Sequence, residues 1–382
     1  MHRRGAPSSH LSTIKPRNSQ GPNRRHHPLR SAVGVALLAL LAGCAKDAPQ
    51  DYLDPSGPIA KEADHLFKEI MFFAVIPVLV IVEALLVFTL IRYRHRPDRP
   101  KPVEALGRTK LRWIVAPAVI LMLVDLFPMA KEAKITFELA REPEGGGAPL
   151  QVEVIGHMWW WEFVYPRLGV TTANVLHIPI GRPVRLTLKS TEPGLDAPGS
   201  GQVAAGVIHS FWVPKLAGKQ DVIPGRENKM TLIAEEPGEY FGQCAEYCNL
   251  SHANMRLRVI AQDPLDFGDW VAQQKEPAAV PASGPAAEGM AIFTGTGACV
   301  TCHTVNGVEG AAGQVGPNLT HLKSRSMFAG ATIENTAENL KKWVRDPSAM
   351  KPMRPDLKTG MPDQDLSDED IEKVVAFLET LK

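Results

Sequence analysis

The sequence predicts a multidomain chain with a two-helix transmembrane hairpin, an all-β sandwich and a small all-α domain. Two long apolar runs lie before residue 131, short alternating segments follow between residues 150 and 261, and a Pro- and Ala-rich stretch precedes a helical C-terminal part. The 382 residues suffice for two or three compact units, because domains usually have about 100 to 200 residues. The formal net charge of +1 indicates no nucleic-acid partner.

The N-terminus has the pattern of an export signal. Residues 24–30 (RRHHPLR) are basic, and the apolar run that follows ends at Cys44. An ordinary transmembrane helix is the alternative, but this run has only about a dozen apolar residues where spanning needs about 17 to 25. Residues 41–44 (LAGC) resemble the bacterial lipobox, so we expect a lipoprotein signal peptide at 1–43, lipidation of Cys44 and a periplasmic N-terminal segment at 44–69.

Residues 70–130 are predicted to form the transmembrane hairpin. The apolar runs 70–91 and 114–130 both reach spanning length. The segment between them is rich in Arg and Lys, which places it in the cytoplasm and everything after about residue 131 on the periplasmic side. Glu83 lies at membrane depth, where it would serve a proton path or contact a partner helix. Two helices alone make a poor membrane domain, so a larger membrane partner is expected.

Residues 131–262 are predicted to fold as the sandwich. Six segments have the alternation and β-branched or aromatic content of strands, with turn residues between them. They are LQVEVIG, WWWEFVY, RPVRLTLKS, GVIHSFWV, NKMTLIA and MRLRVIA. Short strands at this spacing favour an antiparallel sandwich.

The stretch 244–255 (CAEYCNLSHANM) gathers soft metal ligands in one loop. Cys244, Cys248, His252 and Met255 follow one another at intervals of four, four and three residues. Thiolate, imidazole and thioether together suit copper, whereas a structural zinc site, the alternative, rarely recruits methionine. With His209 from the VIHSFWVP segment as a second imidazole, the inventory fits two copper ions bridged by two sulfurs.

Residues from about 60 to 262 resemble subunit II of the haem–copper oxidases, the cytochrome c oxidase type that holds the dinuclear CuA centre. The segments VIHSFWVP, KQDVIPGR and PGEYFGQCAEYCNLSHANM follow that family's order and spacing, and GHMWWWEF stands where the family has its aromatic stretch. The resemblance implies a cupredoxin-like domain, a magnesium ion facing the Glu246 carboxylate at the junction with subunit I, and Trp159 as the residue through which electrons enter CuA. It implies copper ligation by the side chains of His209, Cys244, Cys248, His252 and Met255 and by the backbone carbonyl of Glu246.

Two stretches depart from the family pattern. The segment before the second helix, TKLRWIVAP, carries Lys110 and Arg112 where many subunits II have a glutamate at the mouth of a proton channel. The stretch QVAAGVIH also lacks the acidic residues that usually precede the first copper histidine and dock soluble cytochrome c. The sequence therefore gives less support for a proton input before the second helix. It also gives less support for the docking of a basic cytochrome c beside His209.

The C-terminal part carries a haem-attachment motif. A Pro- and Ala-rich linker is predicted at 263–285, and Cys299, Cys302 and His303 then form CxxCH. Residues 286–382 resemble cytochrome c, which implies thioether bonds to both cysteines, His303 and Met361 as the axial ligands of the iron, and a Pro317 carbonyl that accepts from His303. Met361, followed by proline, is preferred to Met353. Ser367 with Asp370 predicts the start of the last helix.

The interpretation is a cytochrome c oxidase subunit II with a fused cytochrome c domain, located in the bacterial inner membrane with its copper and haem domains outside. An external donor such as cytochrome c would reduce haem c, and electrons would pass through CuA to subunit I, where oxygen is reduced to water; subunit III is a further expected partner. All five cysteines are used, by lipid, copper and haem. The donor subunit of a CuA-containing nitric oxide reductase and a non-catalytic periplasmic copper and haem lipoprotein remain alternatives, whereas a quinol oxidase subunit lacking copper is disfavoured by the complete ligand set.

Overall fold

The structure is a computed structural model that describes residues 48–94, 108–140, 148–191, 206–353 and 360–382. The predicted signal peptide and the lipidation site Cys44 lie outside these residues, as does most of the basic segment predicted to be cytoplasmic. Residues 47–382 form one compact unit.

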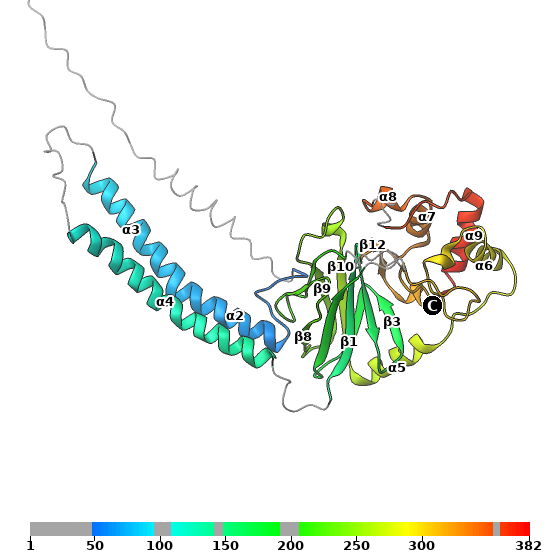
Figure 1. The fold of residues 1–382 in the computed structure, drawn as a ribbon, viewed down its shortest axis with the longest axis horizontal. Coiled ribbons are helices and arrows are strands. Elements are labelled where there is room, and N and C mark those ends of the chain that lie inside the picture. Colours follow the sequence, from blue (N-terminus) through cyan, green and yellow to red (C-terminus); the bar gives the residue numbers. More distant parts are fainter. Residues whose placement is uncertain (1–47, 95–107, 141–147, 192–205, 354–359) are drawn as a thin grey trace, which may run out of the picture. The chain divides into compact units, whose positions relative to one another are not determined.

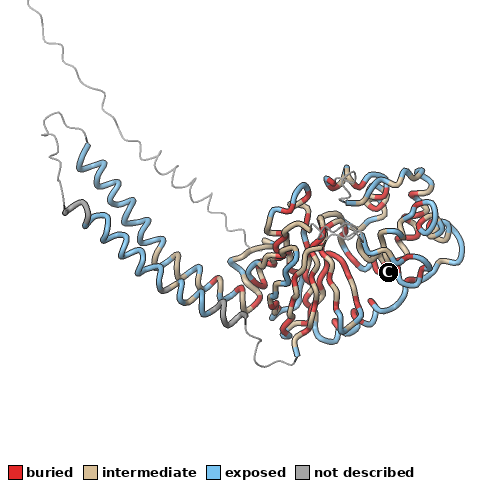
Figure 2. The backbone as a smooth tube through the Cα atoms, in the orientation of Figure 1, coloured by how far each residue is buried: buried red, intermediate tan, exposed pale blue. Residues whose placement is uncertain are grey.

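Two long apolar helical segments precede the β-rich part (Figure 1). The first is continuous from Pro58 to Arg92 and comprises α2 (Pro58–Ile70), a π-helical turn η1 (Met71–Val75) and α3 (Ile76–Arg92). The second is α4 (Arg108–Ala140). Both are long and apolar enough to cross a membrane. The side chains of α3 are exposed along its whole length, whereas α2 has buried and half-buried residues (Figure 2). Lys131 of α4 pairs with Glu69 of α2 at 2.6 Å. The first helix starts about three turns before its predicted apolar run, which begins at residue 70, and so takes in part of the predicted 44–69 segment.

Two five-stranded sheets form the sandwich. One has the order β3-β2-β1-β5-β8 and the other β4-β10-β9-β6-β7. The strands are β1 (Leu150–His157), β2 (Trp160–Tyr165), β3 (Val170–Ala173), β4 (Val175–Pro179), β5 (Val184–Ser190), β6 (His209–Trp212), β7 (Gln220–Val222), β8 (Asn228–Leu232), β9 (Gly238–Cys244) and β10 (Arg256–Gln262). All six predicted strand segments are present. The expected purely antiparallel arrangement is wrong, because β1 pairs with β5 and β10 with β4 in parallel. Alternation within a segment shows that it is a strand but not which partner lies beside it.

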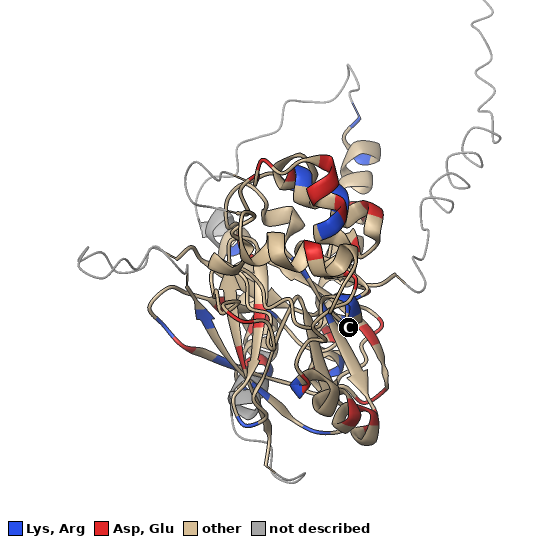
Figure 3. Ribbon diagram, turned by 90° about the vertical axis from the view of Figure 1, so that its right-hand side faces the viewer, with Lys and Arg blue, Asp and Glu red and all other residues tan. Residues whose placement is uncertain are grey.

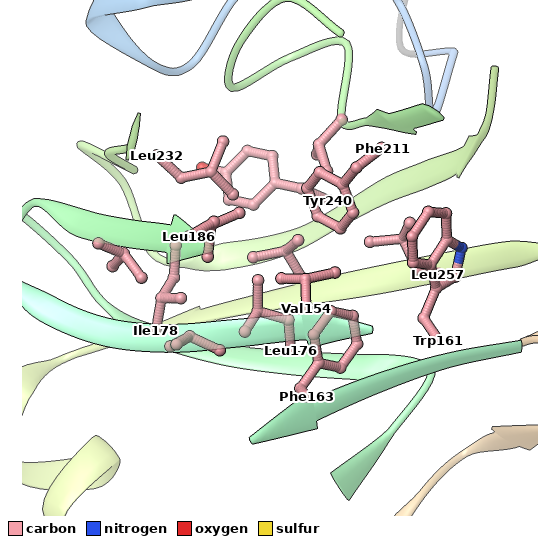
Figure 4. Packing of buried hydrophobic residues seen from close by; sticks show 14 of the residues in the cluster. Val154, Trp161, Phe163, Leu176, Ile178, Leu186, Phe211, Leu232, Tyr240 and Leu257 are labelled. Atoms are coloured by element: carbon pink, nitrogen blue, oxygen red, sulfur yellow. The ribbon is translucent and has the colours of Figure 1, made fainter. Parts of the chain in front are cut away.

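The core lies between the two sheets (Figure 4). Side chains from one sheet, among them Val154, Phe163 and Leu186, point toward Phe211 and Leu257 of the other, and all five are at most 1% exposed. The inward residues alternate along each strand, as in β1. Apolar burial on both inner faces holds the strand ends, and hence the loops between them, in fixed positions.

The stretch 263–285, predicted as a linker, begins with the helix α5 (Pro264–Lys275). Phe267, Trp270 and Val271 of α5 are buried in the sandwich core. The Trp270 ring stacks on His177 of β4, with the ring centroids 4.2 Å apart and an interplanar angle of 10°. The first half of this stretch is therefore part of the sandwich fold, which its Pro- and Ala-rich second half concealed.

The C-terminal domain has a second core of its own. Its elements are α6 (Pro285–Thr294), η3 (Cys299–Thr301), η4 (Leu322–Ser324), β11 (Met327–Phe328), β12 (Ile333–Glu334), α7 (Ala337–Arg345), α8 (Pro347–Met350) and α9 (Asp368–Leu378). The predicted start of α9 is confirmed, since the amide of Asp370 donates to the Ser367 hydroxyl at 3.1 Å. Phe293 of α6 meets Phe377 of α9 edge to face at 5.3 Å. Acidic and basic residues lie next to one another on these helices (Figure 3).

Candidate copper and haem sites

The first predicted copper ligands lie on two neighbouring strands. His209 begins β6, Cys244 ends β9, and these strands pair so that Phe211 lies opposite Cys244. This register brings the Cys244 Sγ to 3.8 Å from the His209 Nδ1. A side chain on Gly156 would meet the His209 ring, since its Cβ would lie 2.8 Å from the imidazole Cδ2. Glycine at position 156 therefore makes room for the His209 ring.

The remaining ligands come from the loop between β9 and β10. The loop is closed at its base, where the Cys244 amide donates to the Met255 carbonyl at 2.9 Å. Within it, the amide of His252 donates to the carbonyl of Asn249. The φ of Asn249 is 82°, a left-handed turn conformation that asparagine tolerates. The short 3₁₀ turn η2 (His252–Asn254) then leads into β10. The closed base and the turn point Cys248, His252 and Met255 back toward Cys244.

The six predicted ligands form two sets around a pair of sulfurs. The Sγ atoms of Cys244 and Cys248 are 3.7 Å apart. Cys244 lies beside His209 and 3.2 Å from the Glu246 carbonyl, while the Cys248 Sγ lies 3.6 Å from the His252 Nδ1 and 3.9 Å from the Met255 Sδ. His209, Cys248 and Met255 are at most 1% exposed. Each sulfur thus has its own imidazole and its own weaker donor.

This donor set fits a pair of copper ions. Soft sulfur and imidazole ligands select copper, and a thioether is a typical weak ligand of copper but not of structural zinc. The hydrogen bond from the Cys248 thiol lowers the pKa of Cys244, so a thiolate forms readily there, and the Cys248 thiol loses its proton when metal binds. The Nε2 of His209 is buried and has no hydrogen-bond partner among the described residues. The residues present therefore fit the dinuclear centre predicted from the sequence.

Trp159 lies directly on the copper loop. Its Nε1 donates to the Cys248 carbonyl at 2.7 Å, and the side chain is only 2% exposed. Of its neighbours, Trp161 is a core residue that meets the His209 ring at 5.8 Å, and Trp160 stacks on His157 at 4.2 Å. Trp160 and Trp161 therefore have the contacts of packing residues.

The CxxCH motif forms a tight turn in the C-terminal domain. Cys299 opens η3, and the amide of His303 donates to the Cys299 carbonyl at 2.9 Å. The Nδ1 of His303 lies 2.8 Å from the Pro317 carbonyl, which confirms the contact predicted from the cytochrome c resemblance. Burial lowers the pKa of His303, so its ring is neutral near pH 7. A neutral ring that donates through Nδ1 leaves Nε2 free to bind iron.

A buried arginine gives this domain a second feature suited to haem. Arg325 is 8% exposed, one of its terminal nitrogens donates to the Asn318 carbonyl at 2.7 Å, and its Nε has no partner among the described residues. Burial lowers the pKa of Arg325 to about 10, which still leaves it charged near neutral pH. Haem carries carboxylates, and an unpaired guanidinium nitrogen suits a carboxylate.

The two candidate axial methionines both lie near the sandwich side of this domain. Met353 is 9% exposed and belongs to the sandwich core cluster, while Met361 is half-buried and packs against that cluster. The residues 354–359 between them are outside the described part of the chain. The preference for Met361 stays a prediction.

Sequence reasoning missed several residues that shape these sites. Gly156 and Gly316 each approach a ligand histidine, since a Cβ on Gly316 would lie 2.5 Å from the His303 Cε1. Each glycine stands close in sequence to a site motif, which was the only available signal. Lys351 and Ser251, which connect the two domains, gave no signal at all.

A sandwich carrying paired thiolates, a CxxCH domain and two apolar helices define a membrane-anchored electron-transfer protein. Residues 46–130 match the transmembrane domain of cytochrome c oxidase subunit II, residues 200–262 its periplasmic domain, and residues 286–382 the cytochrome c family. Cytochrome c oxidase subunit 2 of Alkalihalophilus pseudofirmus is 33% identical over 91% of this chain and 95% of its own length. The chain belongs to the cytochrome c oxidase subunit 2 family, and it carries the additional cytochrome c domain.

Other relatives have related names. Cytochrome c oxidase subunit 2 of Bacillus subtilis is 29% identical over 83% of this chain and 89% of its own length, and quinol oxidase subunit 2 of Bacillus cereus is 30% identical over 65% and 81%. Among solved structures, the periplasmic domain of subunit II of the Bradyrhizobium japonicum cytochrome oxidase aligns with 34% of this chain and 96% of that domain, at 25% identity and a TM-score of 0.29. The subunit II domain match implies a CuA copper centre, and the cytochrome c match implies a haem.

Proposed function

We propose that this chain is the subunit through which electrons enter a haem–copper terminal oxidase, with each metal group held by the residues described above. His209, Cys244, Cys248, His252, Met255 and the Glu246 carbonyl would hold the copper pair, and Cys299, Cys302, His303 and Met361 would hold haem c. When bound, these groups supply reversible one-electron chemistry at the copper and iron ions. Oxygen is reduced elsewhere, in subunit I.

One observation carries the copper assignment. The Cys244 and Cys248 sulfurs lie 3.7 Å apart, and each faces a different histidine Nδ1. Two neighbouring sulfurs, two imidazoles, a thioether and a carbonyl together offer six donor atoms. This is more than the four that a structural zinc ion takes, and it suits two metal ions. The burial of Cys244, Cys248 and His209 limits the access of water to these donor atoms.

The protein residues around haem have two tasks. His303 is oriented by its contact with the Pro317 carbonyl, and Arg325 offers an unpaired nitrogen to a carboxylate. Ligation by Met361 would keep the reduction potential high, as in cytochromes c with a His and Met pair. Trp159, which touches the copper loop through its indole nitrogen, would be the side chain through which electrons reach the copper pair.

Paramagnetic resonance of the oxidised full chain tests the copper assignment. One unpaired electron shared over two equivalent copper nuclei gives a hyperfine pattern that neither zinc nor a single copper can give. A mononuclear pattern, or a zinc-filled site without a signal, would contradict the assignment. Comparing oxygen with nitric oxide consumption by the purified complex separates the terminal oxidase from the nitric oxide reductase.

The wider setting follows from the same assignment. Two apolar helices and the family suit a bacterial inner membrane with the metal domains on the periplasmic side. The half-buried Glu246 would place its carboxylate toward a magnesium ion shared with subunit I, and subunit III and an external donor complete the set of partners. Detergent extraction should recover a large polytopic haem protein with this chain; recovery of the chain alone would favour the lipoprotein alternative.

A further inference from the structure

The C-terminal domain is fastened to the copper loop by several polar contacts. The Ser251 hydroxyl donates to the Pro352 carbonyl at 2.5 Å, and the amide of Arg256 donates to the Gly330 carbonyl at 3.0 Å. The Nζ of Lys351 donates to the Trp159 carbonyl at 2.6 Å and to the Ala329 carbonyl at 3.0 Å. Every one of these contacts on the sandwich side involves the copper loop, the first residue after it, or Trp159.

Lys351 differs from the other paired lysines of its domain. Lys341, Lys342 and Lys373 are at least partly exposed and pair with carboxylates, as surface lysines commonly do. Lys351 is 4% exposed, and its hydrogen-bond partners are two carbonyls contributed by the two domains. Burying a lysine costs free energy unless its hydrogen bonds are made, so this placement favours the docked arrangement of the domains.

The backbone beside Lys351 is shaped for the same contact. Ala329, Gly330 and Ala331 have φ values of 52, 80 and 54°, three left-handed residues in succession. Alanine adopts this conformation only at a cost in free energy, and such strain concentrates at functional contacts. A Cβ on Gly330 would lie 2.4 Å from the Asn254 carbonyl oxygen and 2.7 Å from the Lys351 Nζ. The loop tip therefore has no spare room against the copper loop.

We propose that Lys351 is a positioning residue, which holds the haem domain on Trp159 and the copper loop in the arrangement used for electron transfer within this chain. The proposal rests on the proposed function. It follows that the fused domain covers the very residue through which a separate donor would reduce the copper pair, since Trp159 is 2% exposed. External donors would then reduce only the fused haem.

A continuous set of hydrogen bonds supports this role. Lys351 binds the Trp159 carbonyl, and the Trp159 indole binds the carbonyl of the copper ligand Cys248. In each transfer one electron would pass from ferrous haem c, which becomes ferric, to the oxidised copper pair, and no bond or proton would change place. The lysine acts through the position of Trp159.

The test compares Lys351→Met with Lys342→Met in the full chain within its complex, at equal haem and copper content. Lys342 is an exposed lysine of the same domain, paired with Glu338. Loss of the Lys351 contacts should lower the protection of the Arg256 amide against hydrogen exchange, and the rate of electron transfer from photoreduced haem c to copper, each about tenfold. Lys342→Met should change neither, and the copper resonance signal should be the same in all chains.

Gly330→Ala provides the second variant. It keeps the lysine but forces the loop tip off the copper loop. It should therefore also lower the protection of the Arg256 amide and the rate of electron transfer from haem c to copper. If Lys351→Met fails to assemble, this variant tests the proposal in its place. Wild-type exchange and transfer rates in either assembled variant would overturn the proposal. The proposal would also be overturned if the Arg256 amide lost protection while the rate of electron transfer from haem c to copper stayed unchanged. If wild-type haem c transfers no electron to copper at all, the proposed function fails, whereas amide exchange still reports whether Lys351 docks the domains.

Discussion

The sulfur atoms of Cys244 and Cys248 lie 3.7 Å apart, and each is paired with a different histidine. Cys248→Ser should therefore convert the shared site into a mononuclear one, because a hydroxyl oxygen is a hard, weak ligand for copper. Copper content should fall from two ions per chain to one or none, with loss of the two-nucleus hyperfine pattern.

The matched control is Tyr247→Phe, an exposed position in the same loop, which should keep the full signal. A Cys248→Ser chain that retains a pattern from two equivalent copper nuclei would show that the two sulfurs do not bridge the metals.

Gly156→Ala tests the close approach at the first histidine. The added methyl would lie 2.8 Å from the His209 Cδ2 and 3.3 Å from the Trp161 ring, so the imidazole must shift. We expect copper affinity to fall about 10–100-fold, the usual effect of disturbing a residue that orients a ligand. The copper affinity is measured as the amount of copper that the protein retains after dialysis against increasing concentrations of a chelator. Gly218→Ala should keep wild-type retention, because Gly218 is an exposed glycine of the same domain and no described residue lies within 4 Å of the added methyl.

The sequence predicts the parts of this molecule whose signals are local. Alternation located the six strand segments, and the ligand spacing at 244–255 located the copper loop, because both depend on residues that are close along the chain. The parallel pairing of β1 with β5 and the packing of α5 on His177 depend on residues far apart and had no local signature. The cysteine total of five fits the predicted uses, and the four described cysteines form no disulfide with one another.

The contact between the two metal domains was the largest omission. Lys351 lies in a Pro- and Met-rich segment where nothing in the composition indicates a buried lysine. Its importance depends on the Trp159 carbonyl, 192 residues earlier in the chain. A linker prediction from composition could state that the domains are tethered, but the docking surface requires the tertiary structure.

The axial ligand of haem is tested by a pair of methionine variants. Met361→Leu should abolish the sulfur-to-iron charge-transfer absorption of the ferric haem and lower its midpoint potential by at least about 100 mV, because axial ligands set potentials over a span of about 0.8 V. Met353→Leu, at a buried methionine that packs on the sandwich core, should keep both. The reverse result would assign the iron to Met353.

His177 should make the stability of the sandwich depend on pH. Burial lowers the pKa of His177 to about 4, below its usual 6.5. Between pH 6.5 and 4 the unfolded chain therefore binds a proton that the folded chain does not, so stability falls as pH decreases through this window, by at most about 3 kcal/mol. Thermal unfolding of wild type and His177→Gln at pH 7 and pH 5 measures the effect. The wild type should lose more stability than the variant, and equal losses would contradict the assignment.

Gly289 holds the crossing of α6 and α9 in the haem domain. A Cβ at this position would lie 1.8 Å from the Lys373 carbonyl oxygen and 2.4 Å from its carbon, and a backbone atom of a packed helix cannot turn aside as a side chain can. Gly289→Ala should therefore separate the helices and weaken contacts such as that between Phe293 and Phe377. Overpacking of this kind typically costs about 1–3 kcal/mol. In a domain of this size the loss of stability should lower the midpoint of thermal unfolding by roughly 5–20 °C. Haem absorbance of the full chain during heating measures this midpoint.

Gly268→Ala is the control for the Gly289 variant, because the same substitution at this position should raise the stability instead of lowering it. Gly268 is an exposed residue inside α5, and none of the residues in the described part of the chain lies within 4 Å of an added methyl. Alanine at such a helical position stabilises by about 0.5–1 kcal/mol, because glycine loses more backbone entropy on folding. The haem-domain midpoint should not change in this variant. A Gly289→Ala chain that unfolds at the wild-type temperature would mean that α6 and α9 do not cross at Gly289, and the close packing of the haem-domain core would then need another origin.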